Sequence, residues 1–282
     1  MAITVNTNIP SLTAQKSLNK ATNAMNTAME RMSTGYKINS SKDDAAGMAV
    51  ATNLAYKASS FKVAQDNAQM GQSMLDTTEG VLDVIKDNLT RVRDLTEQAA
   101  NGTYGTDALT AIKSEITARL GEIDRVSSSA DFNGKTLLNG TITSNIELQV
   151  GIGKADSNST ISVSSSLFAN ANSESLLGAA WNADTTITND STARTFLQSV
   201  DSAIDKVTSR KTTIGGLQAR ITSAMDTANV MQTNLTSAAS LIQDADVAEE
   251  SSNYIKQQIL QQTSASLLAT ANQAPSIASS LI

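Results

Sequence analysis

The two ends of this chain are free of the residues that interrupt helices. Residues 1–34 and 217–282 contain no glycine, and the two prolines, Pro10 and Pro275, lie one near each end. Glycine and proline are the residues that most destabilise a helix interior. Each end can therefore form a long helix, and breaks between the two prolines must come from glycine clusters and turn residues.

The longest regular pattern of the chain begins at Val200. Apolar residues recur there at every seventh position, with a second row three residues further along. The two rows are Val200, Val207, Ile214, Ile221, Ala228, Leu235 and Ile242, and Leu217, Ala224, Met231 and Ala238. This spacing is typical of a coiled-coil seam and predicts one helix that is much longer than a usual globular helix.

Two more helices are predicted before that seam. The first carries apolar residues spaced by seven from Phe61 to Leu89 and should end at Asn101-Gly102. The second has one apolar face and carries Thr106 or Asp107 as the residue that caps its start. That face consists of Leu109, Ile112, Ile116, Leu120, Ile123 and Val126. We expect these three helices to bundle as a rod.

The pattern changes after residue 130, where four glycines fall between residues 134 and 153 and the apolar spacing becomes alternating. Thr141–Thr143, Ile146–Val150 and Thr160–Val163 are predicted to be strands of a small β-hairpin region. Residues 164–193 are rich in serine, asparagine and threonine, and they predict a surface loop at the tip of the rod with Trp181 as its only bulky anchor.

The terminal helices carry apolar stripes of their own. Leu18, Met25 and Met32 are spaced by seven, and Leu260 and Leu267 repeat this spacing near the other end. Isolated amphipathic helices are marginal in water, so these must pair with one another, pair with neighbours or stay unfolded until a partner binds. Because a rod offers no globular body to cover them, we expect their burial to occur between molecules.

The composition excludes most catalytic and metal-binding chemistry. The chain has no histidine and no cysteine, so a serine–histidine triad, a thiolate nucleophile and the usual zinc sites are ruled out. The formal net charge is −6, with the basic residues scattered, which argues against nucleic acid as a partner. The first twenty residues lack the pattern of a signal peptide, and no stretch predicts a membrane span. No cofactor is expected.

Several segments of the chain resemble bacterial flagellin. The most specific is Arg31–Ser40, RMSTGYKINS, which runs into Lys42–Gly47, KDDAAG. Further matches are Leu89–Leu95, Glu122–Val126, Phe132–Lys135, Lys256–Gln262 and Ala271–Gln273. The resemblance covers roughly residues 1–140 and 195–282 in the expected order. One departure is Leu241, where the family commonly has arginine.

The resemblance implies a mainly α fold: an elongated coiled-coil rod with a small β-hairpin region and with its N- and C-terminal helices paired. The large outer domains of longer flagellins would be missing. The implied domains are 1–56 as the N-terminal part of the inner coiled coil with its connector, 57–164 as the N-terminal part of the rod, 165–193 as the short variable tip loop, 194–238 as the C-terminal rod helix and 239–282 as the C-terminal part of the inner coiled coil.

The function that the resemblance implies is that of a structural subunit, not an enzyme, which self-assembles into the extracellular flagellar filament for swimming or swarming. Its implied partners are further copies of itself, a flagellar export chaperone, the hook-associated junction and cap proteins, and Toll-like receptor 5 of a host. Export would use the flagellar type III apparatus, without a cleaved signal peptide. One alternative is a hook–filament junction protein, and similarity across residues 89–135 argues against it. Another is an enzymatic flagellin with a metalloprotease insert, for which histidine is missing.

Two groups of residues are site candidates. Lys42, Asp43 and Asp44 are interpreted as contacts in a turn-rich connector between the inner and outer layers, in preference to a carboxylate pair for acid–base catalysis. Four further residues match the flagellin positions that the receptor senses, and their alternative role is a solvated helix face that packs between subunits. They are Arg91, Leu95, Gln98 and Glu115. The resemblance implies both roles, with this surface buried in the filament and exposed in the monomer.

Overall fold

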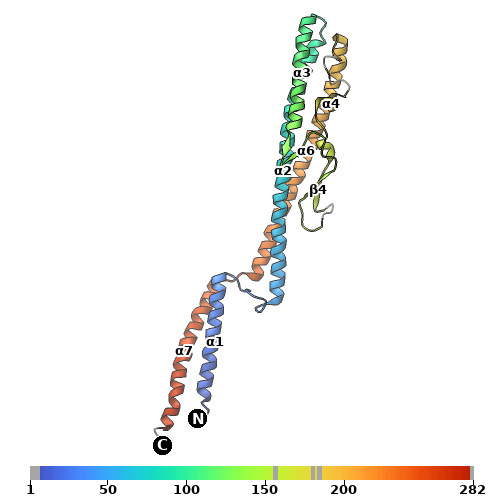
Figure 1. Cartoon of the computed structure of the whole chain (residues 1–282). Coiled ribbons are helices and arrows are strands. Elements are labelled where there is room, and N and C mark those ends of the chain that lie inside the picture. The colour runs from blue at the N-terminus through green and yellow to red at the C-terminus, as the bar shows by residue number, and fades with distance from the viewer. Residues whose placement is uncertain (1–6, 155–157, 179–181, 183–185, 280–282) are drawn as a thin grey trace. The chain divides into compact units, whose positions relative to one another are not determined.

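The computed structural model describes residues 7–154, 158–178, 182 and 186–279. Its elements are helices together with two small antiparallel strand pairs, so the predicted mainly α fold is confirmed (Figure 1). The chain divides into two compact units. Unit 1 is Met1–Ala58 with Thr233–Ile282, and unit 2 is Ser59–Gln232, whereas the resemblance implied divisions after residues 56 and 238. Trp181 lies outside the described residues.

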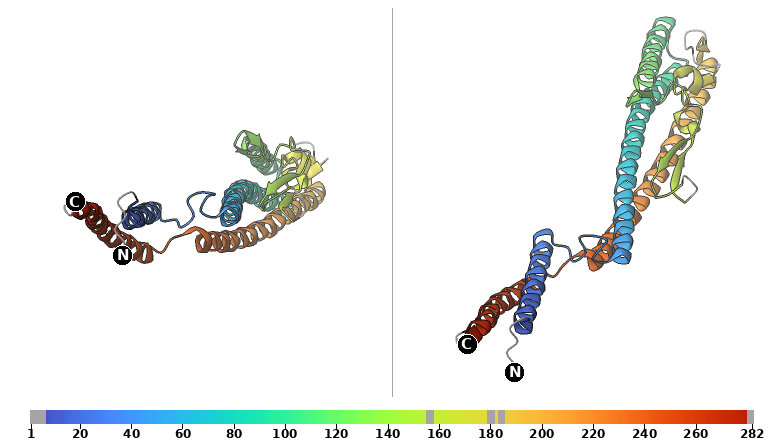
Figure 2. Two further views of the ribbon diagram at one scale, coloured as in Figure 1. Left: turned by 90° about the horizontal axis from the view of Figure 1, so that it is seen from below. Right: turned by 60° about the horizontal axis from the view of Figure 1, so that its bottom comes forward.

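Unit 1 contains the two terminal helices, α1 (Ile9–Thr34) and α7 (Val247–Ser279). They lie side by side and antiparallel, so the predicted pairing of the chain ends is confirmed (Figures 1 and 2). Helix α1 starts where the side chain of Asn8 accepts a hydrogen bond from the Ser11 amide at 3.1 Å. It ends at Gly35, whose φ of 75° is easy for glycine alone and lets its amide bond the Arg31 carbonyl at 2.9 Å.

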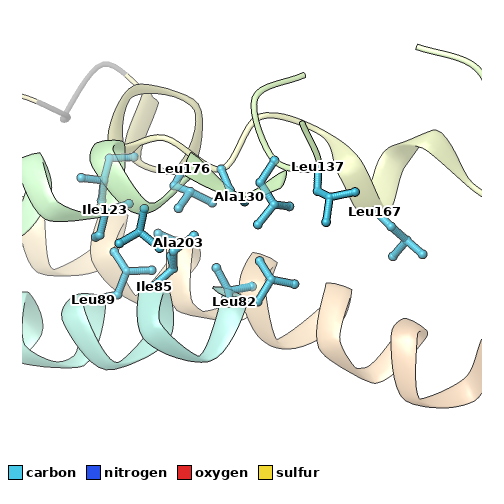
Figure 3. Close-up of a cluster of buried hydrophobic side chains, with 14 of the residues drawn as sticks. Leu82, Ile85, Leu89, Ile123, Ala130, Leu137, Leu167, Leu176 and Ala203 are labelled. Atoms are coloured by element: carbon cyan, nitrogen blue, oxygen red, sulfur yellow. The ribbon is translucent and has the colours of Figure 1, made fainter. Parts of the chain in front are cut away.

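Unit 2 is built on most of the helices α2 (Ala45–Ala99) and α6 (Asp190–Gln243), which run antiparallel, and on α3 (Thr106–Ser129). The two predicted seams are buried in one hydrophobic core from Ala68 to Leu89 and from Val200 to Ile221, and side chains of α2, α3 and α6 point toward one another there (Figure 3). Beyond Ile221 the predicted seam leaves this core, since Met231 is exposed and Leu235 and Ile242 are half-buried. The fully buried members of the core include Leu75, Leu82, Leu89, Ile116, Ile123, Val200, Val207, Ile214 and Ile221. Apolar heptad spacing therefore predicted the core of this unit correctly.

The ends of α2 and α3 were predicted with different success. Helix α2 ends at Ala99, immediately before the expected stop at Asn101-Gly102. Helix α3 begins at Thr106, but its capping residue is Gly105, and no side chain caps it. The prediction that Thr106 or Asp107 caps this helix is therefore wrong, because both residues already lie inside its first turn.

Polar pairs join α2 to α6 beside the core. The Arg93 guanidinium donates to Asp201 at 2.8 Å, and its hydrogen bond to that carboxylate raises the pKa of Arg93. Lys211 of α6 pairs with Asp83 of α2. Because these pairs are partly exposed, they fix the alignment of the two helices more than they stabilise the unit.

Two of the three predicted strands are present. Strand β3 (Ile146–Gln149) pairs antiparallel with β4 (Thr160–Val163), and Leu148 lies opposite Ile161. The hairpin packs closely on α2 at Gly71, where an added Cβ would lie 2.5 Å from Cδ1 of Leu148. Glycine at this position therefore lets the hairpin approach the helix backbone.

The third predicted strand, Thr141–Thr143, is wrong. The hydroxyl of Thr141 donates to the Asn139 side chain at 2.7 Å, and this local turn replaces strand pairing. The sequence analysis missed a smaller antiparallel pair, β1 (Asp131–Phe132) with β2 (Lys135–Thr136), whose turn is Asn133-Gly134 with positive φ at both residues.

The prediction of a surface loop over residues 164–193 is also wrong for much of that segment. It contains the 3-10 helix η1 (Ser165–Phe168) and helix α4 (Ser173–Leu177), and Phe168 is completely buried. Two cations of α6 hold it in place: Lys206 donates to the Leu176 carbonyl at 2.8 Å and Arg210 to that of Ala169 at 2.8 Å. The serine-rich composition hid a packed segment, in which Leu167, Phe168, Leu176, Leu177 and Ile187 are buried.

Candidate interaction surfaces

Helix α7 turns a polar row toward α1. Glu250, Gln257 and Ser264 are spaced by seven, and the first and last of them are buried. The next row contributes Gln261, whose side-chain amide donates to the Thr22 hydroxyl of α1 at 3.0 Å. The contact between the terminal helices thus relies on polar groups where a usual coiled coil has leucine or isoleucine.

Most large apolar side chains of α7 are exposed, whereas Tyr254 and Leu268 are half-buried. Leu260 is 44% exposed and Leu267 58%, and Ile255 and Ile259 are exposed as well. We call these four residues the α7 apolar set. Four large apolar side chains in water on one helix are the mark of an interaction surface rather than of a folded core.

The apolar stripe of α1 behaves differently from that of α7. Leu18, Met25 and Met32 are half-buried within unit 1, next to a fully buried row formed by Ala21 and Ala28. The stripe that we expected to be covered by other molecules is therefore covered in part by α7 of the same chain. Other apolar side chains of α1 remain exposed, namely Ile9, Leu12 and Met29.

The connector between α1 and α2 is organised by its two aspartates. Asp43 accepts hydrogen bonds from the amide and hydroxyl of Ser40 and from the Asn39 amide, at 3.0–3.2 Å. These bonds, first that of the Ser40 amide, hold the pKa of Asp43 below its usual 3.8. Asp44 caps the start of α2 by accepting from the amides of Ala46 and Gly47. Lys42 is exposed beside them. The carboxylates thus shape a turn.

A cluster of contacts, which we call the clasp, joins the end of α1 to the start of α7. Backbone bonds run from the Lys37 amide to the Gln243 carbonyl at 2.7 Å and from the Ala245 amide to the Gly35 carbonyl at 2.8 Å. Next to them Arg31 pairs with Glu250 at 2.9 Å, and only 11% of the Glu250 side chain is exposed. The Lys37 ammonium adds a bond to the carbonyl of Leu241, whose own side chain is 80% exposed.

Of the four residues predicted to act together around Arg91, three are at least partly exposed and one is buried. Arg91 donates to Glu115 of α3 through two nitrogens, at 2.8 and 3.0 Å, and both side chains are partly exposed. Gln98 is exposed on the same helix, seven residues after Arg91. Leu95 is only 2% exposed and belongs to the core of unit 2. The side chain of Leu95 therefore does not lie on the surface, and the residues of this set that solvent reaches are Arg91, Gln98 and Glu115.

Comparison with protein families decides the identity of the chain. Residues 5–143 match the family described as "Bacterial flagellin N-terminal helical region", and residues 197–281 match "Bacterial flagellin C-terminal helical region". The chain belongs to the bacterial flagellin family. It is therefore a structural protein rather than an enzyme, and a subunit that assembles with copies of itself into the extracellular flagellar filament.

Individual relatives agree with this assignment. The chain is 35% identical to a flagellin of Xenorhabdus nematophila over the full length of both proteins. It is 33% identical to "Flagellar filament 30.7 kDa core protein" of Treponema maltophilum, with 95% of each chain covered. A solved structure of a putative flagellar hook-associated protein from Vibrio parahaemolyticus has a TM-score of 0.60 and 17% identity, and covers 71% of this flagellin and 99% of its own chain. That likeness shows the shared fold.

The structure adds contacts to this flagellin that sequence reasoning missed. The Arg31–Glu250 pair and the clasp join segments more than two hundred residues apart, and no local pattern links them. One signal was available, since Glu250, Gln257 and Ser264 place polar residues at heptad spacing on a helix whose apolar residues fall elsewhere. Among the described residues, no helix is long and apolar enough to cross a membrane.

Proposed function

We propose that this flagellin polymerises by burying the α7 apolar set, together with the exposed apolar residues of α1, against neighbouring copies. The observation that carries the proposal is the orientation of α7, which turns a polar row to α1 and leaves Leu260 and Leu267 in water. Contacts that join different surfaces of successive copies extend a filament when the rotation between copies does not close a ring.

The hydrophobic gain is large enough to drive such growth. Burying one leucine side chain contributes about 1.5–3 kcal/mol. Each such contribution changes an association constant about tenfold to a hundredfold. The set holds four side chains of this size, and the gain from burying them opposes the entropy that is lost when subunits associate.

The direct test replaces Leu260 and Leu267 by serine in one variant. Both side chains are exposed in the single molecule, so the free energy of unfolding of the soluble chain should change little. The critical concentration for filament growth should rise at least about a hundredfold. The matched control replaces Gln258 and Gln262, two exposed residues of the same helix, by serine. Equal growth of both variants would contradict the proposal.

The rival function is that of a hook–filament junction protein, which would sit in few copies at the base of a filament. The match of residues 5–143 and 197–281 to flagellin supports a filament subunit for swimming or swarming. The two functions differ in a simple observation. A filament subunit alone in solution, seeded with filament fragments, grows to micrometre lengths, whereas a junction protein does not extend the seeds.

A second role is recognition by the host Toll-like receptor 5 through Arg91, Gln98 and Glu115. Support comes from the Arg91–Glu115 ion pair, which holds α2 and α3 together on an exposed surface. Reporter cells that carry the receptor test it: Arg91→Ala and Glu115→Ala should each lose signal, and Arg125→Ala, which removes the exposed pair with Glu122, should not. Full signal from all three variants would exclude this surface.

The exposed apolar residues of α7 also have a consequence for export of the chain. An export chaperone that covers the α7 apolar set before secretion would prevent early polymerisation in the cell, and the junction and cap proteins would meet the exported chain at the filament ends. We propose export through the flagellar type III apparatus without a cleaved signal peptide. The intact mass of the chain recovered from filaments checks this: loss of an N-terminal segment would contradict it.

A further inference from the structure

The interior of the α1–α7 pair is nearly uniform along its length, and this leaves the alignment of the two helices poorly specified by packing. On α1 the inward residues are alanines and medium-sized apolar residues repeated at seven-residue spacing: Ala14, Ala21 and Ala28 beside Leu18, Met25 and Met32. A slip of one heptad, about 10 Å, replaces alanine by alanine and leucine by methionine. Packing alone therefore separates these two alignments weakly.

The buried carboxylate of Glu250, near the start of α7, distinguishes the two alignments strongly in energy. Glu250 is 9% exposed and accepts a hydrogen bond from Arg31 at 2.9 Å. The neighbouring contacts pair residues whose numbers fall steadily along α7 as they rise along α1, such as Thr22 with Gln261 and Ser11 with Asn272. A slip of one heptad would bring Glu250 to the level of Ala24 and Met25, where α1 offers no cation. A buried carboxylate without its partner is strongly disfavoured.

We infer that Arg31 and Glu250 are the register-determining residues of this flagellin: their buried ion pair, reinforced by the backbone bonds of the clasp, selects the one alignment of α1 with α7 that is competent for assembly. A single polar contact that sets the register of a helical pair is the best supported role for such groups. The inference rests on the proposed function, because it takes the α7 apolar set to be the surface that neighbours cover.

The consequence for assembly is geometric. The level of α7 against α1 decides which exposed apolar residues of the two helices stand side by side on the surface that a neighbour meets. The pairings Ser11–Asn272 and Thr22–Gln261 set Leu267 of α7 near the level of Lys16, about one turn from the exposed Leu12 of α1. A slipped subunit would present a mismatched surface and would add to a filament poorly.

Charge reversal with rescue tests the pair. Arg31→Glu and Glu250→Arg should each raise the critical concentration for seeded growth at least about tenfold, because each places two like charges in a partly buried site. The double variant, Arg31→Glu with Glu250→Arg, restores an ion pair and should recover growth to within a few-fold of the wild type. A double variant as defective as the single variants would overturn the inference, and so would normal growth of the single variants.

A second measurement reads the register itself. The natural chain has no cysteine, so introduced pairs report without background. Ser11→Cys with Asn272→Cys should be joined by a short thiol-reactive cross-linker, because Oγ of Ser11 lies 2.7 Å from Oδ1 of Asn272, whereas Ser11→Cys with Ala265→Cys reports the alignment slipped by one heptad. Adding Arg31→Glu should shift cross-linking from the first pair to the second, and the charge swap should restore it. Unchanged cross-linking would overturn the inference even where growth is impaired.

The two proposals fail in different ways. If the variant with Leu260 and Leu267 replaced by serine grows filaments like the wild type, the proposed function is contradicted, whatever the result with the Arg31 and Glu250 variants. Growth that depends on these leucines but not on Arg31 and Glu250 would remove the register inference alone.

Discussion

The two units of this flagellin differ in where they put their apolar side chains. Of the 41 buried hydrophobic residues in the described part of the chain, 36 lie in unit 2 and five in unit 1, four of them alanines. Of the 18 exposed large hydrophobic residues there, 12 lie in unit 1. Unit 2 is stabilised by its own core. Unit 1 leaves most of its large apolar residues exposed, and the proposed function assigns them to contacts with other copies.

Two long helices with apolar residues at regular spacing therefore differ in whether those residues are buried within the chain. The apolar heptads of α6 face α2 and α3 within one molecule, so Val207 and Ile214 are fully buried. On α7, by contrast, Ile255, Ile259, Leu260 and Leu267 are exposed, although the helix packs along α1. The difference teaches that heptad spacing alone does not tell whether the partner of a seam lies in the same chain or in the next copy.

The largest contrast is expected between Phe168→Ala in unit 2 and Ile259→Ala in unit 1. Phe168 is fully buried, so its removal should cost about 3–5 kcal/mol of unfolding free energy. Ile259 is 57% exposed, so its removal should change the stability of the soluble chain by about 0.5 kcal/mol or less. Thermal and denaturant unfolding measure both. Equal losses would erase the distinction between the units.

A smaller effect is expected when the interior of unit 1 is enlarged. Ala28 is 3% exposed between α1 and α7, and Ala28→Leu adds three carbons where there is little space. Overpacking of this kind costs about 1–3 kcal/mol. Amide hydrogen exchange should therefore speed up in α1 and α7 and stay unchanged in α3. Faster exchange throughout unit 2 would show that the two units do not behave separately.

A slight effect on stability is expected from the Arg91 surface. The Arg91–Glu115 pair is partly exposed on both sides, with 44% and 38% of the side chains accessible. Such pairs contribute about 0–1 kcal/mol, so Arg91→Ala should leave the unfolding midpoint nearly unchanged. This separates recognition from folding in the receptor experiment. A loss of several kcal/mol would mean that the residue is part of the core of unit 2.

The smallest effect concerns the connector and appears only in acid. The pKa of Asp43 is lowered by the hydrogen bonds that it accepts, so the unfolded chain binds its proton more readily than the folded chain. Its contribution to stability is present above the usual pKa of 3.8 and is lost as the pH falls through the lower folded value. Asp43→Asn should flatten the acid end of the stability curve. An unchanged acid slope would contradict this role.

The sequence was informative where structure is local or strictly periodic. The seam from Val200 to Ile221, the stop after Ala99 and the strands β3 and β4 all follow from spacing and turn residues. The serine-rich segment misled because Phe168 and Leu176 are too few to form a pattern, and only the packed core shows where they point. Leu95 misled for a related reason, since matching positions in a motif does not say which face of α2 is buried.

For the terminal helices, the sequence predicted the helices and their apolar stripes but not the contacts between them. The exposed state of Leu260 and Leu267, the half-buried state of Met25 and the Arg31–Glu250 pair depend on which side α7 turns to α1. That choice is made by polar residues of α7 that look like a solvated face in the sequence. The heptad spacing of Glu250, Gln257 and Ser264 could have marked the side of α7 that faces a partner. It does not identify Arg31 as the residue that pairs with Glu250, because the pairing of distant polar groups leaves no periodic signal.

The central claim is that the α7 apolar set is exposed to solvent in the single molecule and buried between subunits in the filament. Maleimide labelling of Leu267→Cys in the otherwise cysteine-free chain tests it most directly, with labelling rates compared between soluble protein and filaments of the same preparation. We predict rapid labelling of the soluble chain and at least about tenfold slower labelling in filaments, as burial in a subunit contact requires. Equal rates in the two states, or a soluble chain that is already protected, would contradict the account.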